Sequence, residues 1–173
     1  MSEHGALQDL VILDLTRVLA GPFCTMMLSD MGAQVIKIEV PGTGDDTRTY
    51  PPFRKNKDGK QESLYYANIN RNKKSLTLNL KSEEGKDIFR RLVKKADIVT
   101  ENYRPGVMDK LGLGYEELKK INPRLIYGSV SGFGNTGPYR LRPGYDILSQ
   151  AMGGLMSITG AVGGPPTRAG SAM

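Results

Sequence analysis

Short apolar runs separated by helix-like segments recur along the chain, and this alternation predicts a parallel β-sheet. In residues 7–15, the positions from Leu10 to Leu13 are all apolar, as in a strand that is buried on both of its faces. Later runs of the same character lie at residues 33–40, 97–102 and 124–134. Residues 74–80 alternate apolar and polar positions instead, which predicts a further strand with its leucines on one face.

Helical signals fill the stretches between these strands. Pro22 suits the first turn of a helix that ends near Gly32, and Ser82 is expected to cap a helix with an acidic first turn and a basic last turn. We expect two short helices within residues 105–123 and another within residues 146–160 that ends near the double glycine. The buried stripes of the first two helices are expected to be Phe23, Met26, Met27 and Met31, and Ile88, Phe89, Leu92, Val93 and Ala96.

Between residues 41 and 72 the pattern dissolves into glycines, prolines and charged residues, so we expect no regular structure there. A stretch of this length inside a compact domain usually serves function or lies at an interface. We find no internal repeat and no linker that would divide the chain. The sequence therefore predicts one α/β domain over residues 1–173, with enough residues for its own core.

Composition limits the chemistry that the chain can perform. Hydrophobic residues make up 39% and charged residues 24%, which is ordinary for a globular protein, and no apolar run is long enough to span a bilayer. The polar, acidic N-terminus does not resemble a signal peptide, so we expect a cytoplasmic protein. The single histidine, His4, and the single cysteine, Cys24, argue against a Ser-His-Asp triad, a Cys-His pair, an internal disulfide and a metal site. Carboxylates, Tyr, Arg, Lys or backbone amides would have to carry any catalysis.

The formal net charge is +6, and the basic residues occur in four clusters. Most of these clusters are typical of solvated surface or of the basic last turn of a helix. Few aromatic residues are interleaved with them, which makes nucleic acid a poor candidate partner. A small polyanionic ligand fits better, because a few phosphates need only a few cations.

Ligands of open parallel sheets bind beyond the carboxyl ends of the strands, which here are polar, glycine-containing loops. Arg17 follows the first strand, where it either reaches into this crevice or covers the sheet edge. Asn102 and Tyr103 end another strand, where an amide and a ring suit an adenine base, although a turn asparagine and a half-buried tyrosine fit the spacing equally well. Glu39 stands where a dinucleotide fold places its ribose-binding acid, but the glycine fingerprint of that fold is absent.

Taken in order, these segments resemble the N-terminal half of the family III coenzyme A transferases. The resemblance covers the chain from about Leu7 to its last residue and rests on LDLTRVLAGPFCTMMLSDMGAQVIKIE, GDDTR, NRNKKSLTLNL, DIVTENYRPGVMDKLGLGYEEL, NPRLIYGSVSGFGNTGPY, GYD and GPPTRAG. It implies a Rossmann-like parallel sheet with flanking helices, and coenzyme A as a substrate received at the turn after the first strand. In this family an aspartate forms a mixed anhydride and then an aspartyl-CoA thioester, and the subunits form interlocked dimers.

Carried over position by position, the resemblance implies roles for three sets of residues. Contacts with coenzyme A at the first turn and beside the adenosine are expected from Arg17, Val18, Ala20, Asn102 and Tyr103. Partners of the phosphates are expected among Arg71, Lys73, Lys74 and Lys110, with Arg104 as a further candidate. Tyr145 and Asp146 match positions near the acyl group, where they would support the reaction.

Two departures from the family pattern bear on activity. The nucleophilic aspartate of the family follows a segment that corresponds to PPTRAGSAM, so we expect it just beyond Met173, in a longer enzyme of which this chain is a fragment without the small domain and the C-terminal return segment. The related α-methylacyl-CoA racemases carry a histidine where this chain has Tyr145, and a tyrosine is a poor base near neutral pH. The resemblance therefore favours CoA transfer, with a racemase or an inactive CoA-binding module as the alternatives.

Overall fold

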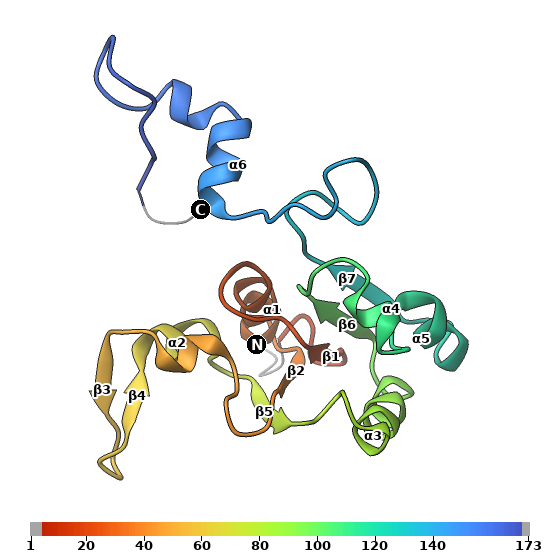
Figure 1. Ribbon diagram of the computed structural model, residues 1–173. Coiled ribbons are helices and arrows are strands. Elements are labelled where there is room, and N and C mark those ends of the chain that lie inside the picture. Colours follow the sequence, from red (N-terminus) through yellow and green to blue (C-terminus); the bar gives the residue numbers. More distant parts are fainter. Residues whose placement is uncertain (1–4, 171–173) are drawn as a thin grey trace. The chain divides into compact units, whose positions relative to one another are not determined.

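The structure, a computed structural model, describes residues 5–170 and forms two compact units. The first unit extends to Val130 and holds the sheet with its helices, while the second begins at Ser131 and holds α6 (Figure 1). Residues 131–145, which connect β7 to α6, form no helix or strand. The apolar pattern contains no linker signal at this boundary, because its glycines and prolines resemble those of the other loops.

Five parallel strands form the sheet in the order β5–β2–β1–β6–β7. Their bounds are Val11–Asp14 (β1), Gln34–Glu39 (β2), Lys74–Thr77 (β5), Ile98–Glu101 (β6) and Ile126–Ser129 (β7). All five coincide with strands that the sequence predicts, and the predicted α/β class is confirmed. This is the order of a doubly wound sheet, in which the winding reverses between β1 and β6, and such sheets bind ligands at that point.

The core lies on both faces of the sheet. Ile12 and Leu13 are adjacent in β1 but enter different apolar clusters, because successive strand residues point to opposite faces. The larger cluster contains Leu13 together with Phe89 and Val93 from one helix and Leu118 from another. The alternating leucines of residues 74–80 also pack against this cluster, as predicted.

Helices on the two faces begin and end where the capping signals indicate. Their bounds are Ala20–Asp30 (α1), Glu83–Val93 (α3), Val107–Lys110 (α4) and Tyr115–Ile121 (α5). The Ser82 hydroxyl accepts a hydrogen bond of 3.1 Å from the Gly85 N–H, which caps α3 as predicted. Gly32 follows the end of α1 with a φ of 106°, a conformation that favours glycine.

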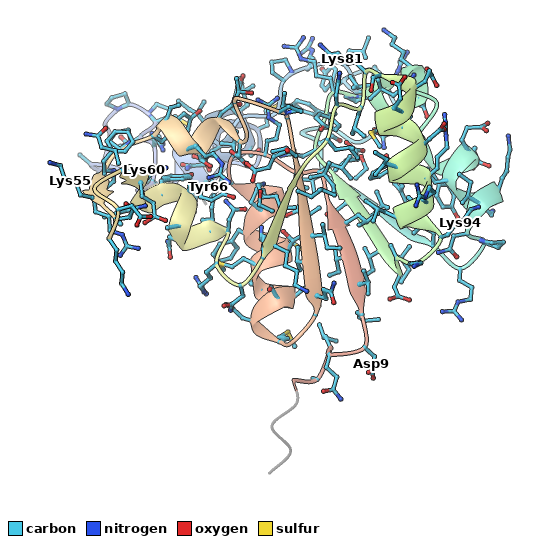
Figure 2. The ribbon with its side chains drawn as sticks, turned by 90° about the horizontal axis from the view of Figure 1, so that it is seen from below. Asp9, Lys55, Lys60, Tyr66, Lys81 and Lys94 are labelled. Atoms are coloured by element: carbon cyan, nitrogen blue, oxygen red, sulfur yellow. The ribbon has the colours of Figure 1, made fainter. Side chains whose placement is uncertain are left out.

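The prediction that residues 41–72 lack regular structure is wrong. They form a 3₁₀ turn, a hairpin and a helix, with bounds Asp46–Thr49 (η1), Phe53–Lys55 (β3), Gln61–Ser63 (β4) and Leu64–Ile69 (α2). The hairpin strands are short, and all of β3 and the first residue of β4 are exposed, so they show no apolar alternation. The hairpin stands away from the sheet with α2 between them (Figure 1), and Lys55 and Lys60 extend from it into solvent (Figure 2).

The buried stripes of α1 and α3 are narrower than predicted. Of the four residues predicted for the stripe of α1, only Met26 is buried, at 3% exposure, whereas Phe23, Met27 and Met31 are about half exposed. The face of α1 that meets the sheet is instead made of small residues, including Gly21, Thr25 and Ser29. In α3, Ile88 is also exposed, and Gly85, Phe89 and Val93 form the buried face, which Ala96 extends beyond the helix.

The second unit contains α6 (Asp146–Met152) and a short 3₁₀ helix, η2 (Leu155–Ser157). The helix ends before Gly153 and Gly154, as the double glycine predicts. The Gln150 side chain is buried, and it pairs with both the N–H and the C=O of Ala169. This amide therefore joins α6 to the end of the described chain.

We expect Gly85→Ala to destabilise the protein, although alanine favours a helix over glycine by about 1 kcal/mol. A Cβ at this position would lie 1.9 Å from the Asn79 carbonyl oxygen, which is backbone and cannot move aside freely. The clash should reduce the free energy of unfolding in urea by about 1–3 kcal/mol. The matched control is Glu84→Ala at the adjacent exposed position of α3, and a Gly85→Ala variant as stable as this control would contradict the steric argument.

Candidate functional site

The turn after β1 and the end of β6 meet where the winding of the sheet reverses. The Asn102 side chain accepts a hydrogen bond of 2.8 Å from the Arg17 N–H and donates one of 2.7 Å to the Arg17 C=O. The two residues that the sequence places at neighbouring strand ends are therefore in direct contact. Both polar atoms of the Asn102 amide are used in this way, so its first role is to hold the backbone of the turn.

A small open pocket lies beside this contact. It is lined by Thr16, Arg17, Lys37, Ile38, Glu39, Val40, Gly44, Asp45 and Tyr103. Its inner space of about 10 Å³ is close to the volume that one water molecule needs. The pocket by itself is therefore too small to enclose a nucleoside.

Two candidate contact residues face this pocket. One Arg17 Nη forms an ion pair of 2.5 Å with Asp46, while its Nε is buried and makes no hydrogen bond within the described residues. Tyr103 is partly buried, and its backbone N–H donates a hydrogen bond of 2.7 Å to Glu101. Burial raises the pKa of the Tyr103 hydroxyl, so the ring stays neutral at physiological pH.

The turn continues from Arg17, which lines the pocket, to the first residue of α1. Val18 has a φ of 68°, in the left-handed region, and is partly exposed. Ala20 begins α1, and the preceding Leu19 offers no side chain to cap the helix. The first N–H groups of α1 therefore lie at the carboxyl edge of the sheet without a side-chain cap, and such groups suit an anionic oxygen.

A buried ion pair lies beneath the turn. The Lys73 ammonium donates hydrogen bonds to Asp14 at 3.0 Å, to the Pro22 carbonyl at 2.8 Å and to Asn70 at 3.0 Å. Burial lowers the pKa of Lys73 against the opposing effect of Asp14, whereas the pKa of Asp14 falls despite its burial because Lys73 and Lys37 are close. The three protons of Lys73 are therefore used inside the protein, and its contact with a phosphate stays a prediction.

A second buried pair joins the strand-two lysine to the loop that follows. Lys37 and Asp45 are almost wholly buried, and their charged atoms are 2.8 Å apart. The same Lys37 ammonium donates to the Thr16 carbonyl at 2.8 Å. Neighbouring charges and hydrogen bonds lower the pKa of Asp45 although burial acts against this.

Glu39 is the centre of a third network. Its carboxylate accepts two hydrogen bonds from Arg48, one from the Asp45 N–H, one from Tyr66 and one from Ser75. Burial opposes the charge, yet these donors lower the pKa of Glu39 to about 2. The carboxylate of Glu39 is thus fully used by partners inside the protein. Tyr66 lies between the hairpin and the sheet (Figure 2), and Arg48 stacks on its ring at 3.8 Å.

Several predicted phosphate partners lie elsewhere. Arg71 forms an ion pair with Asp30 at the carboxyl end of α1, and Lys74 begins β5, so both lie away from the strand ends that hold Arg17. Arg104 and Lys110 are exposed around α4, on the side of the site that follows β6. Their proposed contacts with phosphates stay predictions.

Tyr145 and Asp146 belong to the second unit. Tyr145 is 71% exposed and directly precedes α6. Asp146 begins that helix and pairs with Gln150 at 2.8 Å and with Arg168 at 3.6 Å. Their role near an acyl group stays a prediction.

Sequence reasoning missed the buried charges that support the turn, namely Asp14, Lys37 and Asp45. A signal for two of them was present, because Asp14 and Lys37 interrupt apolar runs that were predicted to be buried on both faces. A charged residue in such a strand must find a partner. Asp45 and Asp46 lie in a polar loop, where the sequence offers no comparable signal.

The described residues contain no group of three or more His, Cys, Asp or Glu side chains that could hold a metal ion. Within the same range, no helix is long and apolar enough to cross a membrane. His4 lies outside the described residues, and Cys24 is an exposed free cysteine on α1.

We expect Glu39→Gln to remove part of the acid sensitivity of the protein. The folded pKa of Glu39 is about 2 against an ordinary value of 4.5, so its stabilisation is complete above pH 4.5 and is lost as the pH falls toward 2. The difference in the free energy of unfolding between wild type and this variant should shrink by about 2 kcal/mol from pH 7 to pH 3. Urea titrations from pH 7 to pH 3 measure this difference in the free energy of unfolding, and Glu84→Gln at an exposed position is the control. A difference that does not change with pH would refute the role of the Glu39 network.

Several known proteins that are similar to this chain are named as CoA-transferases. Acetyl-CoA:oxalate CoA-transferase of Acetobacter aceti is 56% identical over 166 residues, which cover 96% of this chain and 41% of that protein. Succinyl-CoA:glutarate CoA-transferase of Homo sapiens is 52% identical over 174 residues, which cover 100% of this chain and 39% of that protein. The chain thus spans about two fifths of the length of these relatives.

Solved structures of similar proteins share the fold, and this chain likewise covers less than half of each of them. A CAIB/BAIF family protein from Brucella suis matches with a TM-score of 0.93 and 47% identity over 98% of this chain and 45% of its own. A Mycobacterium tuberculosis protein matches with a TM-score of 0.83 and 37% identity over 95% of this chain and 45% of its own. The pattern that defines CoA-transferase family III matches residues 7–173. The resemblance of the ordered motifs is therefore confirmed, and the chain belongs to CoA-transferase family III.

Proposed function

We propose that the whole protein transfers coenzyme A between two carboxylic acids. The observation that carries this proposal is the family match over residues 7–173, combined with the direct contact of Arg17 and Asn102 at the reversal point of the sheet. Several relatives are named as CoA-transferases. In this proposal the described residues bind the coenzyme, and their backbone turn and cations neutralise its phosphates.

The proposed chemistry needs a carboxylate nucleophile. An aspartate attacks the thioester carbonyl of the donor, which forms a mixed anhydride and releases the CoA thiolate. The thiolate then attacks the aspartyl carbonyl, which releases the donor acid and leaves an aspartyl-CoA thioester. Repetition in reverse with the second acid delivers the product. Following the family pattern, we place this aspartate outside the 173 residues, and an aspartate-to-alanine mutant of the M. tuberculosis protein is among the similar structures.

Within this chain, Arg17, Val18 and Ala20 are proposed to contact coenzyme A at the turn. Asn102 and Tyr103 are proposed to lie at its adenosine. Lys110 and Arg104 follow β6, and their exposed cations are proposed to meet the phosphates. Tyr145 and Asp146 are proposed to face the acyl group.

The acceptor is proposed to be a dicarboxylic acid. The relatives are named for oxalate, glutarate, mesaconate and citramalate, each of which carries a second carboxylate. We further propose a cytoplasmic homodimer with interlocked subunits, for which the support is the resemblance of the sequence motifs.

Hydroxylamine tests the covalent mechanism. Whole protein incubated with an acyl-CoA should lose activity on addition of hydroxylamine, because the aspartyl-CoA thioester is converted to a hydroxamate on one aspartate. Peptide mass spectrometry locates the modified residue, and protein incubated without acyl-CoA is the control. Protein that stays active and unmodified while transferring CoA would refute the aspartyl intermediate, and CoA binding without transfer would indicate a binding module.

We expect Arg17→Ala and Asn102→Ala to weaken CoA binding by about tenfold, because an ionic hydrogen bond contributes roughly 1.5–3 kcal/mol. Arg17→Ala removes the cation at the pocket, and Asn102→Ala releases the turn that carries it. Isothermal titration calorimetry of the whole protein with CoA measures both effects. Arg91→Ala, an exposed arginine of α3, is the control, and unchanged affinity in the first two variants would remove them from the site.

Acceptor screening tests the substrate class. With succinyl-CoA as donor, C2 to C5 dicarboxylic acids should give kcat/KM values at least about tenfold above those of monocarboxylic acids of equal length, since one buried charge-assisted hydrogen bond accounts for that factor. Equal values for both series would contradict a dicarboxylate acceptor while leaving CoA transfer intact.

A further inference from the structure

The turn after β1 contains a strained residue. Val18 has a φ of 68°, where a β-branched side chain is a genuine outlier because its Cβ crowds the backbone carbonyl. Strained residues persist only where the surrounding structure over-determines them. Val18 comes two residues before Ala20, the first residue of α1, so its conformation sets the direction in which the chain leaves β1.

One buried ion pair holds the backbone on both sides of Arg17. The Lys37 ammonium donates to the Thr16 C=O at 2.8 Å, and the Val18 N–H donates to Asp45 Oδ1 at 3.4 Å. Lys37 and Asp45 are in turn 2.8 Å apart. The pair therefore closes a ring of contacts around the strained peptide.

The burial of this pair requires an explanation beyond stability. The side chains of Lys37 and Asp45 are 1% and 0% exposed. Charges buried to this degree lose their hydration, and a well-packed apolar pair of similar volume is often as stable or more so. We therefore ask which part of the backbone the Lys37–Asp45 pair holds in a specific geometry.

The ion pair lies at the candidate ligand pocket. Lys37 and Asp45 line it together with Arg17 and Tyr103. The Asp45 carboxylate is fixed on its own loop by the Thr47 N–H at 2.9 Å and the Thr47 hydroxyl at 2.8 Å. The oxygen that accepts from the Val18 N–H at 3.4 Å is thus held by two shorter hydrogen bonds from Thr47.

We propose that Lys37 and Asp45 are positioning residues that hold Val18 in the left-handed conformation, so that the turn presents its backbone to the coenzyme. This inference rests on the proposed function. The pair acts through the turn and does not itself touch the reacting atoms.

A rescue experiment tests the proposal, because glycine adopts a positive φ without strain. In the whole protein, Asp45→Asn and Lys37→Met should each raise the Kd for CoA and the KM for acyl-CoA by about tenfold, with a smaller effect on kcat. In the V18G background the same substitutions should raise Kd and KM by less than about threefold. Equal losses in both backgrounds would overturn the proposal, since a purely structural role does not depend on the residue at position 18.

Val40→Gly is the matched control. Val40 is a β-branched, half-exposed residue that lines the same pocket, but it is not among the residues with positive φ. Its replacement should not reduce the losses caused by Asp45→Asn or Lys37→Met. Rescue by V40G equal to that by V18G would show a general gain in flexibility and would contradict the inference.

A crystal structure separates this inference from the proposed function. In D45N or K37M, residue 18 should leave the left-handed region, and retention of a positive φ in both variants would overturn the positioning role whatever the ligand data show. Wild-type protein that fails to bind CoA would refute the proposed function instead. Lys37→Met keeps the volume of the side chain, so it remains a test where Asp45→Asn does not fold.

Discussion

Charges buried inside a protein must be paired, and this requirement organises the carboxyl edge of the sheet. Asp14 and Lys73 pair beneath the first turn of α1, while Lys37 and Asp45 pair beside it. Each lysine also binds a backbone carbonyl, Pro22 for one and Thr16 for the other. Strands β1, β2 and β5, helix α1 and two loops are thus joined by two ammonium groups. These contacts satisfy the buried charges beneath the candidate site.

The same principle explains how residues 41–72 are ordered without a core of their own. Glu39, at the end of β2, binds Arg48 and Tyr66 and so attaches η1 and α2 to the sheet. Ser63 then caps α2 through the Tyr66 N–H, at 3.1 Å. Polar contacts with one buried carboxylate take the place of an apolar stripe, and a sequence pattern based on hydrophobicity does not register them.

The sequence predicts the sheet because apolar runs and caps are local signals. The five strands and the cap at Ser82 follow from residues that are close together in the chain. Arg17 and Asn102 come together because the carboxyl ends of parallel strands meet at one edge of the sheet. That the Asn102 amide bonds to the Arg17 backbone depends on the exact distance between the two strands. Lys73 shows what such reasoning leaves out, because only the fold places Asp14 beside it. The polar buried face of α1 also depends on distant residues, since the hydroxyls of Thr25 and Ser29 donate to Asp14 and to the Asn72 carbonyl.

The amide contact between Asn102 and Arg17 has a consequence for strand alignment. Asp14 lies opposite Thr100 in the pairing of β1 with β6, and the contact forms a few residues further on. A slip of one residue would turn Asn102 to the opposite side and bring Glu101 or Tyr103 to its place. Neither side chain combines an N–H donor with a carbonyl acceptor, so neither could replace both bonds. Insertions or deletions in β1 or β6 would thus abolish this contact even where the apolar core tolerates them.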